Sequence, residues 1–218
     1  MSFSWLYYLG CWLSGLMLLV FTRWEVKGKE NVPPSGALIV VANHLHNADP
    51  PILGASIPRK LLFMAKEELF QSWPGGFFIR AVGAFPVRRG GQDRRALKTA
   101  EAMLRQGMVV AMFPEGTRSK TAQLQAAFPG SALVALQSGA PILPVGITGS
   151  DKLRGGALFF RRPRVLVNIG HPFTLPPRDR VLSRSALQEA TTMIMKSIAD
   201  LVPPSYRGAY GEDPDAAH

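Results

Sequence analysis

The sequence predicts an α/β fold, a mostly parallel sheet flanked by helices, with an N-terminal membrane-anchoring helix. Three observations lead to this prediction. Short apolar segments alternate with helix-like segments, as parallel strands and their helical crossovers do. The first 22 residues contain no charged side chain. The chain has 218 residues, 47% of them hydrophobic, which is enough for one substantial core and excludes a disordered protein.

The N-terminal apolar stretch covers residues 3–22. About 20 helical residues match the thickness of a bilayer core, about 30 Å. Trp5 and Trp24 lie near its two ends, where aromatic rings prefer the membrane interface. Cations follow the stretch (Arg23, Lys27) and none precedes it, which favours an anchor over a removable signal peptide and places the body on the cytoplasmic face. A spanning helix, an interfacial helix and a buried core helix all remain open.

Five later segments predict strands that are buried on both faces, because each is short, continuously apolar and rich in β-branched residues. These segments are Ala37–Asn43, Leu61–Ala65, Met108–Phe113, Pro141–Thr148 and Arg164–Gly170.

Three segments between and after these strands predict helices. Residues 94–106 place apolar side chains on one stripe and stop at Gly107, as a helix with a C-terminal glycine does. Residues 131–137 predict a shorter helix, and Ser185 predicts the capping box of a last helix that runs to about Leu201. We expect the acidic, proline-containing tail at residues 203–218 to be disordered.

Charge and cysteine content narrow the class of protein. The 25 Lys and Arg exceed the 15 Asp and Glu, giving a net charge of +10 and predicting an anionic partner such as a membrane surface, a phosphorylated substrate or nucleic acid. The one cysteine, Cys11, excludes an internal disulfide framework and a cysteine-rich metal site.

The first candidate for chemistry follows the predicted strand at residues 37–43. His44 comes directly after it, and Asp49 stands five residues further on. If the chain turns into a helix there, the carboxylate can orient the imidazole as a general base.

Three further blocks accompany this pair. They are Gly83–Arg89, Phe113–Ser119 (Phe-Pro-Glu-Gly-Thr-Arg-Ser) and Pro141–Val145. With His44–Asp49 as a His-x4-Asp block, the sequence over about residues 25–175 resembles the glycerophospholipid acyltransferase superfamily, and most of all its 1-acylglycerol-3-phosphate (lysophosphatidic acid) acyltransferases.

The resemblance implies transfer of an acyl group from acyl-CoA or acyl-acyl carrier protein to the sn-2 hydroxyl of lysophosphatidic acid, which forms phosphatidic acid. Membrane lipids are then the further partners, and we expect no nucleic acid, metal ion or cofactor. The chain divides into an anchor at residues 1–24, an acyltransferase domain at 25–202 and a tail at 203–218.

Chemistry assigns roles to most of the candidate residues. An alcohol needs a base to become a nucleophile, which is the role of His44, and Asp49 fixes its tautomer. A phosphate dianion needs forked donors, for which Arg89 and Arg118 are the candidates.

Four more residues complete the predicted substrate site. Gly116 lets the backbone approach the phosphate, Thr117 shares its loop, and Glu115 orients Arg118 or another donor. The resemblance alone suggests Lys66, as a lysine near the acyl group.

Other interpretations compete with these assignments. Arg118 could form a structural ion pair with Glu115, and Arg89 could be a solvated charge. His46 beside His44 could indicate a metal hydrolase. A non-catalytic basic protein that binds membranes or nucleic acid would explain the charge, and glycerol-3-phosphate or another lysolipid could be the acceptor.

Overall fold

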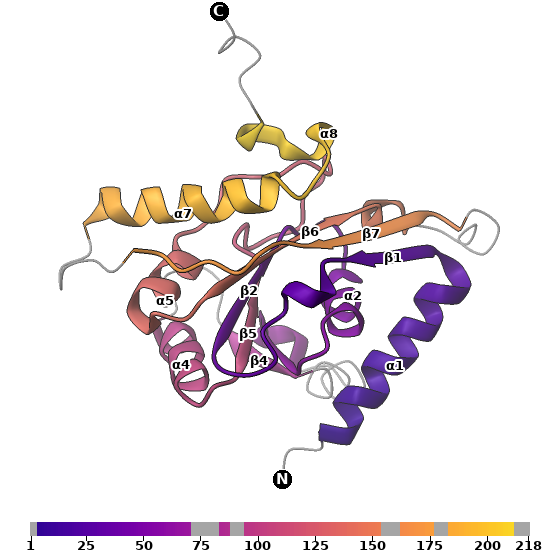
Figure 1. Cartoon of the computed structure of the whole chain (residues 1–218), viewed down its shortest axis with the longest axis horizontal. Helices are drawn as coiled ribbons and strands as arrows, with labels where there is room; N and C mark the ends of the chain where they lie inside the picture. Colours follow the sequence, from indigo (N-terminus) through magenta and orange to yellow (C-terminus); the bar gives the residue numbers. More distant parts are fainter. Residues whose placement is uncertain (1–3, 71–82, 88–93, 154–161, 177–182, 212–218) are drawn as a thin grey trace, which may run out of the picture.

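A central sheet organises the protein (Figure 1). The computed structural model describes residues 4–70, 83–87, 94–153, 162–176 and 183–211. These residues form a seven-stranded sheet with the order β1-β7-β6-β2-β5-β3-β4. The strands are β1 (Arg23–Lys27), β2 (Leu38–Ala42), β3 (Leu61–Lys66), β4 (Ala84–Val87), β5 (Val109–Met112), β6 (Ile142–Thr148) and β7 (Arg164–Ile169).

The mostly parallel sheet is confirmed, because every described neighbouring pair is parallel except β6 with β7. All five predicted strands are present, whereas β1 and β4 were not predicted. Both are edge strands. The sequence of β1 (RWEVK) is mostly polar, and Pro86 interrupts β4, so neither has the continuous apolar pattern of a buried strand.

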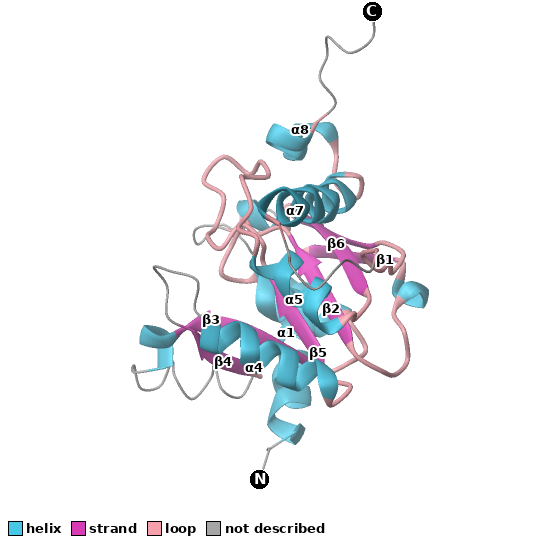
Figure 2. Cartoon of the chain, turned by 90° about the vertical axis from the view of Figure 1, so that its left-hand side faces the viewer, coloured by secondary structure: helices cyan, strands magenta, loops and turns pink. Residues whose placement is uncertain are grey.

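Helices cover both faces of the sheet, as Figures 1 and 2 show. Within β2, Leu38, Val40 and Ala42 belong to one buried cluster, together with residues of α1 (Ser4–Phe21) and α2 (Asp49–Ser56). Ile39 and Val41 point to the opposite cluster. That cluster includes residues of α4 (Arg94–Arg105), α5 (Gly130–Ser138) and α7 (Arg184–Ala199).

The predicted helices differ from the observed ones mainly at their ends. Gly107 adopts a φ of 72° just after α4, which fits its predicted role as a stop. The N-cap of α7 is Ser183, whose side chain accepts from Ala186 N, and not Ser185 as predicted. Two serines stand close together, and the one that reaches the free amide of the first turn is the cap.

The N-terminal stretch forms the helix α1. None of the helices in the described part of the chain has the length and apolar character needed to cross a membrane. Tyr7 and Leu18 are buried, and the Tyr7 hydroxyl accepts a hydrogen bond from Leu61 N at 2.9 Å. The helix is therefore attached to the start of β3 and packs against α2.

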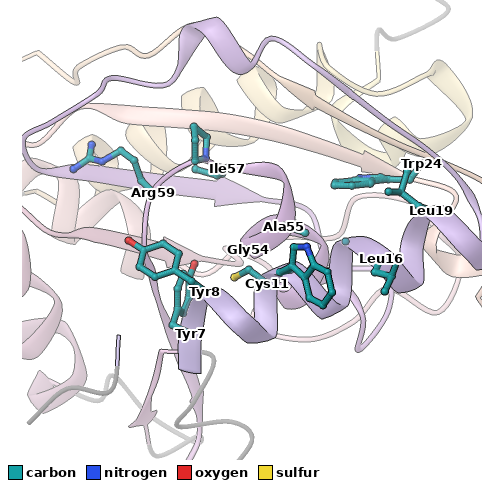
Figure 3. A pocket seen from close by; sticks show the side chains of 13 residues that line it. Tyr7, Tyr8, Cys11, Leu16, Leu19, Trp24, Gly54, Ala55, Ile57 and Arg59 are labelled. Carbon is teal, nitrogen blue, oxygen red and sulfur yellow. The ribbon is translucent and has the colours of Figure 1, made fainter. Parts of the chain in front are cut away.

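A pocket of about 400 Å³ lies between α1 and α2 (Figure 3). Leu16, Leu19 and Trp24 line it toward one end, and Arg59 lies at the other. The Arg59 guanidinium donates to the carbonyl oxygens of Pro33, Gly36 and Gly107, so it holds neighbouring loops together.

The prediction of a disordered tail is wrong for its first part. Residues Pro204–Arg207 form the short helix α8, and Gly208–Tyr210 form a 3-10 turn. The Tyr206 hydroxyl donates to Asp151 Oδ1 at 3.0 Å, which fastens this segment to the domain. Pro204 stands at the first position of α8, where proline is favourable, and Tyr206 and Tyr210 pack against the core. Residues 212–218 lie outside the described part.

Candidate functional site

The candidate site is built on two neighbouring strands at the centre of the sheet. β2 and β5 are parallel, with Val41 opposite Met112, so the segments that follow them leave the same edge of the sheet. One segment carries His44 and Asp49, and the other carries Phe113–Ser119. Sites in α/β proteins form at this carboxyl edge, where loops from adjacent strands meet.

His44 and Asp49 form a close pair, as the sequence predicted. His44 Nδ1 lies 2.9 Å from Asp49 Oδ2. The same carboxylate oxygen accepts hydrogen bonds from Leu45 N at 2.6 Å and His46 N at 2.7 Å. Asp49 is fully buried in the first turn of α2, where the positive end of the helix dipole favours a carboxylate. The turn between strand and helix thus holds the carboxylate in place.

This geometry makes His44 capable of acting as a base. A carboxylate only accepts hydrogen bonds, so Nδ1 carries the proton and Nε2 keeps its lone pair. The side chain of His44 is 13% exposed, which leaves one edge of the ring accessible. The ring stacks on Phe113, with 4.2 Å between the centroids, so its plane is fixed from both the ring face and the Nδ1 edge.

Asn43 is a part of the site that the sequence analysis did not identify. Its side chain donates to Ile147 O at 2.8 Å and accepts from Ile147 N at 2.7 Å. These two buried hydrogen bonds join the end of β2 to β6 immediately before His44. The available signal was an amide side chain at the end of an otherwise apolar strand, where a buried polar group needs a partner.

Glu115 lies beside His44 but does not contact Arg118 through an ion pair among the described residues. Its Oε1 accepts from His44 N and its Oε2 from Gln125 N, both at 3.0 Å. The side chain is 1% exposed. Burial raises the pKa of Glu115 to about 7, and the charge of Asp49 adds to the rise, against the two backbone hydrogen bonds.

Gly116, Thr117 and Arg118 form an exposed loop next to Glu115. Gly116 has a φ of 65°, and a side chain there would collide with the ring of Phe128, so the turn requires glycine. The loop returns to His44 at Ser119, whose N–H donates to His44 O at 2.7 Å. The structure thus brings the exposed loop and the His-Asp pair together.

Two predicted binding residues lie wholly or partly outside the described part of the chain. Lys66 is the last residue of β3, one strand beyond β5, and the position of its side chain is outside the described part. Arg89 lies outside the described residues altogether. Within the described residues no group of three or more His, Cys, Asp or Glu is arranged to hold a metal ion.

Comparison with known proteins agrees with this architecture. The profile of the family "Acyltransferase" matches residues 23–148. The chain belongs to the acyltransferase family. The match includes the His44–Asp49 pair, the Phe113–Ser119 segment and the three central strands, so the protein is an acyltransferase and the matched region contains the candidate site.

Named relatives act on lysolipids. The chain is 30% identical over 182 residues to the 1-acyl-sn-glycerol-3-phosphate acyltransferase of Bacillus subtilis, covering 80% of this chain and 87% of the relative. It is 33% identical over 140 residues to the lyso-ornithine lipid O-acyltransferase of Pseudomonas aeruginosa, covering 63% and 52% of the two chains.

A solved structure shares the fold. The crystal structure of the 1-acyl-sn-glycerophosphate (LPA) acyltransferase PlsC from Thermotoga maritima matches with a TM-score of 0.69 and 26% identity. The match covers 89% of this chain and 79% of that one.

Proposed function

We propose that the protein transfers an acyl group from an acyl thioester to the sn-2 hydroxyl of 1-acylglycerol-3-phosphate, forming phosphatidic acid. The observation that carries the proposal is the pair of the partly exposed His44 and the buried Asp49, held at 2.9 Å beside the exposed loop at residues 116–118. The named activity of the Bacillus and Thermotoga relatives supports the choice of acceptor.

The proposed reaction is a direct acyl transfer. His44 Nε2 removes the proton of the acceptor hydroxyl while the oxygen attacks the thioester carbonyl carbon. The C–S bond of the resulting tetrahedral intermediate breaks, and the imidazolium returns the proton to the thiolate of coenzyme A or acyl carrier protein. Asp49 Oδ2 stabilises the imidazolium in between through Nδ1–H.

The acceptor phosphate needs cations on the same side as the base. Arg118 is exposed in the loop that contacts His44 through Ser119, so its guanidinium is the described cation that we propose for this role. We propose Arg89 as a second phosphate ligand and Lys66 as a ligand near the acyl group, both from the sequence pattern.

A second acceptor has a specific observation in its favour. The Pseudomonas relative is a lyso-ornithine lipid O-acyltransferase, whose acceptor lacks the glycerol phosphate of lysophosphatidic acid. If Arg118 binds the acceptor phosphate, the enzyme should prefer lysophosphatidic acid, because lyso-ornithine lipid offers this cation no phosphate to pair with.

The function is tested with the purified full chain in detergent. The enzyme is offered acyl-CoA or acyl-acyl carrier protein and, in separate reactions, lysophosphatidic acid, glycerol-3-phosphate or lyso-ornithine lipid, and products are identified by mass spectrometry. We expect phosphatidic acid to be the main product, with none from His44→Ala. His171→Ala, at an exposed histidine after β7, is the matched control. Faster acylation of lyso-ornithine lipid would refute the proposed acceptor.

We further propose that α1 lies in the surface of the membrane and keeps the domain on the cytoplasmic face. Large apolar side chains of α1 are exposed. They are Trp5, Tyr8, Leu9, Trp12, Leu13, Leu16, Met17, Leu19 and Val20. An interfacial helix buries such a face at the boundary between headgroups and acyl chains, and a net charge of +10 adds attraction to anionic lipid.

Vesicle flotation tests this location. Trp12→Ser combined with Leu16→Ser changes two exposed positions of α1, and Met193→Ser, an exposed apolar position on α7, is the control. With vesicles of phosphatidylglycerol and phosphatidylethanolamine, we expect the double variant to lose most of its bound fraction and the control to retain it. Equal flotation of all three proteins would refute the location.

A further inference from the structure

The backbone of His44 is held from outside its own loop. Its N–H donates to Glu115 Oε1 at 3.0 Å, and its carbonyl oxygen accepts from Ser119 N at 2.7 Å. Both partners belong to the segment after β5. The peptide groups on either side of the base are therefore fixed by the neighbouring strand's loop.

Glu115 fixes a second segment at the same time. Its Oε2 accepts from Gln125 N at 3.0 Å, and three residues later Phe128 N donates to Pro114 O at 2.9 Å. The ring of Phe128 lies against Gly116. One carboxylate thus joins the base, the exposed loop at residues 116–118 and the segment that packs on that loop.

The residue type suits this use. Burying a carboxylate at 1% exposure is costly unless strong hydrogen bonds satisfy it. Two N–H groups from different segments meet here, and a carboxylate accepts from both. A glutamine of the same size would accept from one and turn its own NH₂ toward the other. The double acceptor is thus specific to an acidic side chain.

Asp49 and Glu115 hold the base in different ways. Asp49 is bonded to His44, Leu45 and His46, so it fixes the ring within one short turn. Glu115 accepts its hydrogen bond from the peptide N–H of His44 and not from the ring. This bond fixes the position of the whole turn relative to the exposed loop at residues 116–118. The first interaction sets the tautomer, and the second sets the place from which Nε2 reaches a substrate.

We propose that Glu115 is a positioning residue, which aligns His44 with the exposed loop at residues 116–118 through the peptide N–H groups of His44 and Gln125 and does not bind the substrate. The inference rests on the proposed function, because it takes His44 as the base. It replaces the expectation that Glu115 orients Arg118.

Steady-state kinetics of the full chain test the proposal. Because a displacement of about 1 Å can lower a rate about 10²-fold, we expect Glu115→Gln to lower kcat by about 10- to 100-fold. The KM values for acyl donor and acceptor should each stay within about threefold. Glu115→Asp keeps a carboxylate that is one methylene shorter and reaches one amide, so its kcat should be intermediate. Glu30→Gln, at an exposed position, is the matched control.

An NMR measurement separates positioning from general damage to the fold. Amide protons bonded to a carboxylate resonate downfield, so the His44 or Gln125 amide should move upfield in Glu115→Gln while those of β6 and β7 do not. If the glutamine variant fails to fold, the same comparison is made with Glu115→Asp.

The outcomes are distinct. An acceptor KM that rises strongly at unchanged kcat would mean that Glu115 serves acceptor binding, and would overturn the proposal. Unchanged kinetics, or unchanged His44 and Gln125 amide signals, would overturn it as well. A wild-type chain that forms no phosphatidic acid would instead refute the proposed function, and the amide signals would still decide whether the two hydrogen bonds exist.

Discussion

Replacing Asp49 by asparagine should remove a charge from the site while keeping its shape. The carboxylate oxygen Oδ2 lies 2.9 Å from His44 Nδ1 and also accepts from two peptide N–H groups. An amide oxygen still accepts these hydrogen bonds, so the turn can persist. What is lost is the attraction between the carboxylate and the imidazolium that forms during the reaction.

The size of this loss follows from the geometry. With about 4 Å between the charge centres and an effective dielectric constant of about 20, the attraction is about 4 kcal/mol. Since a tenfold rate change corresponds to about 1.4 kcal/mol, kcat should fall roughly 10³-fold. The hydrogen bonds from Leu45 N and His46 N would persist but without a charged acceptor, which should lower the free energy of unfolding by about 1–3 kcal/mol.

The assay measures phosphatidic acid formed from acyl-CoA and lysophosphatidic acid in detergent micelles, with urea unfolding in parallel. Asp200→Asn, at an exposed residue after α7, is the control and should retain full activity. A decrease of less than about tenfold for a folded Asp49→Asn would refute the argument, because the imidazolium would then not depend on this carboxylate.

Four further outcomes are expected. Arg118→Lys should raise the KM for the acceptor at least about tenfold, because the forked N–H groups of the guanidinium are lost, with little change in the KM for the acyl donor. Equal effects on both KM values would indicate a structural role for Arg118. His46→Ala should retain most of the activity, since Asp49 contacts the ring of His44 but holds His46 by its peptide N–H, which alanine keeps. Bound zinc or manganese that disappears in this variant would support a metal mechanism instead. Burial raises the pKa of Glu115 from 4.5 to about 7, so between these pH values the folded protein keeps a proton that the unfolded chain has released. The free energy of unfolding should therefore fall by roughly 3 kcal/mol as pH rises from about 4.5 to 7. This pH dependence should be absent in Glu115→Gln. Tyr7→Phe should lower the free energy of unfolding by about 1–3 kcal/mol, because the buried Leu61 N–H loses its acceptor; an unchanged urea midpoint would show that α1 is not attached there.

The central part of the fold could be predicted because its signals are local. Strands buried on both faces are continuously apolar, as β2 is, and the five-residue spacing of His44 and Asp49 lies within one turn. Edge strands carry no such pattern: β1 is largely polar and β4 contains Pro86.

The partners of Glu115 and Asn43 could not be predicted for a different reason. Glu115 accepts from the peptide N–H of His44, and Asn43 pairs with the backbone of Ile147. Every residue except proline has such an N–H, so the sequence does not indicate which residue is the partner of Glu115 or Asn43. Only the order of the strands in the sheet, which places β2 between β6 and β5, determines these contacts.

The position of β2 also has a consequence for how the enzyme acquires its activity during folding. Asp49 and His44 are five residues apart in the sequence, whereas Glu115 and His44 are 71 apart and Asn43 and Ile147 are 104 apart. Contacts between distant residues require large loops to close and form slowly. The turn that contains His44 and Asp49 can therefore form early. A nascent chain that ends before β6 still lacks Ile147, the residue whose backbone pairs with Asn43. Catalytic competence should thus appear late in refolding, after most of the helical circular dichroism has returned.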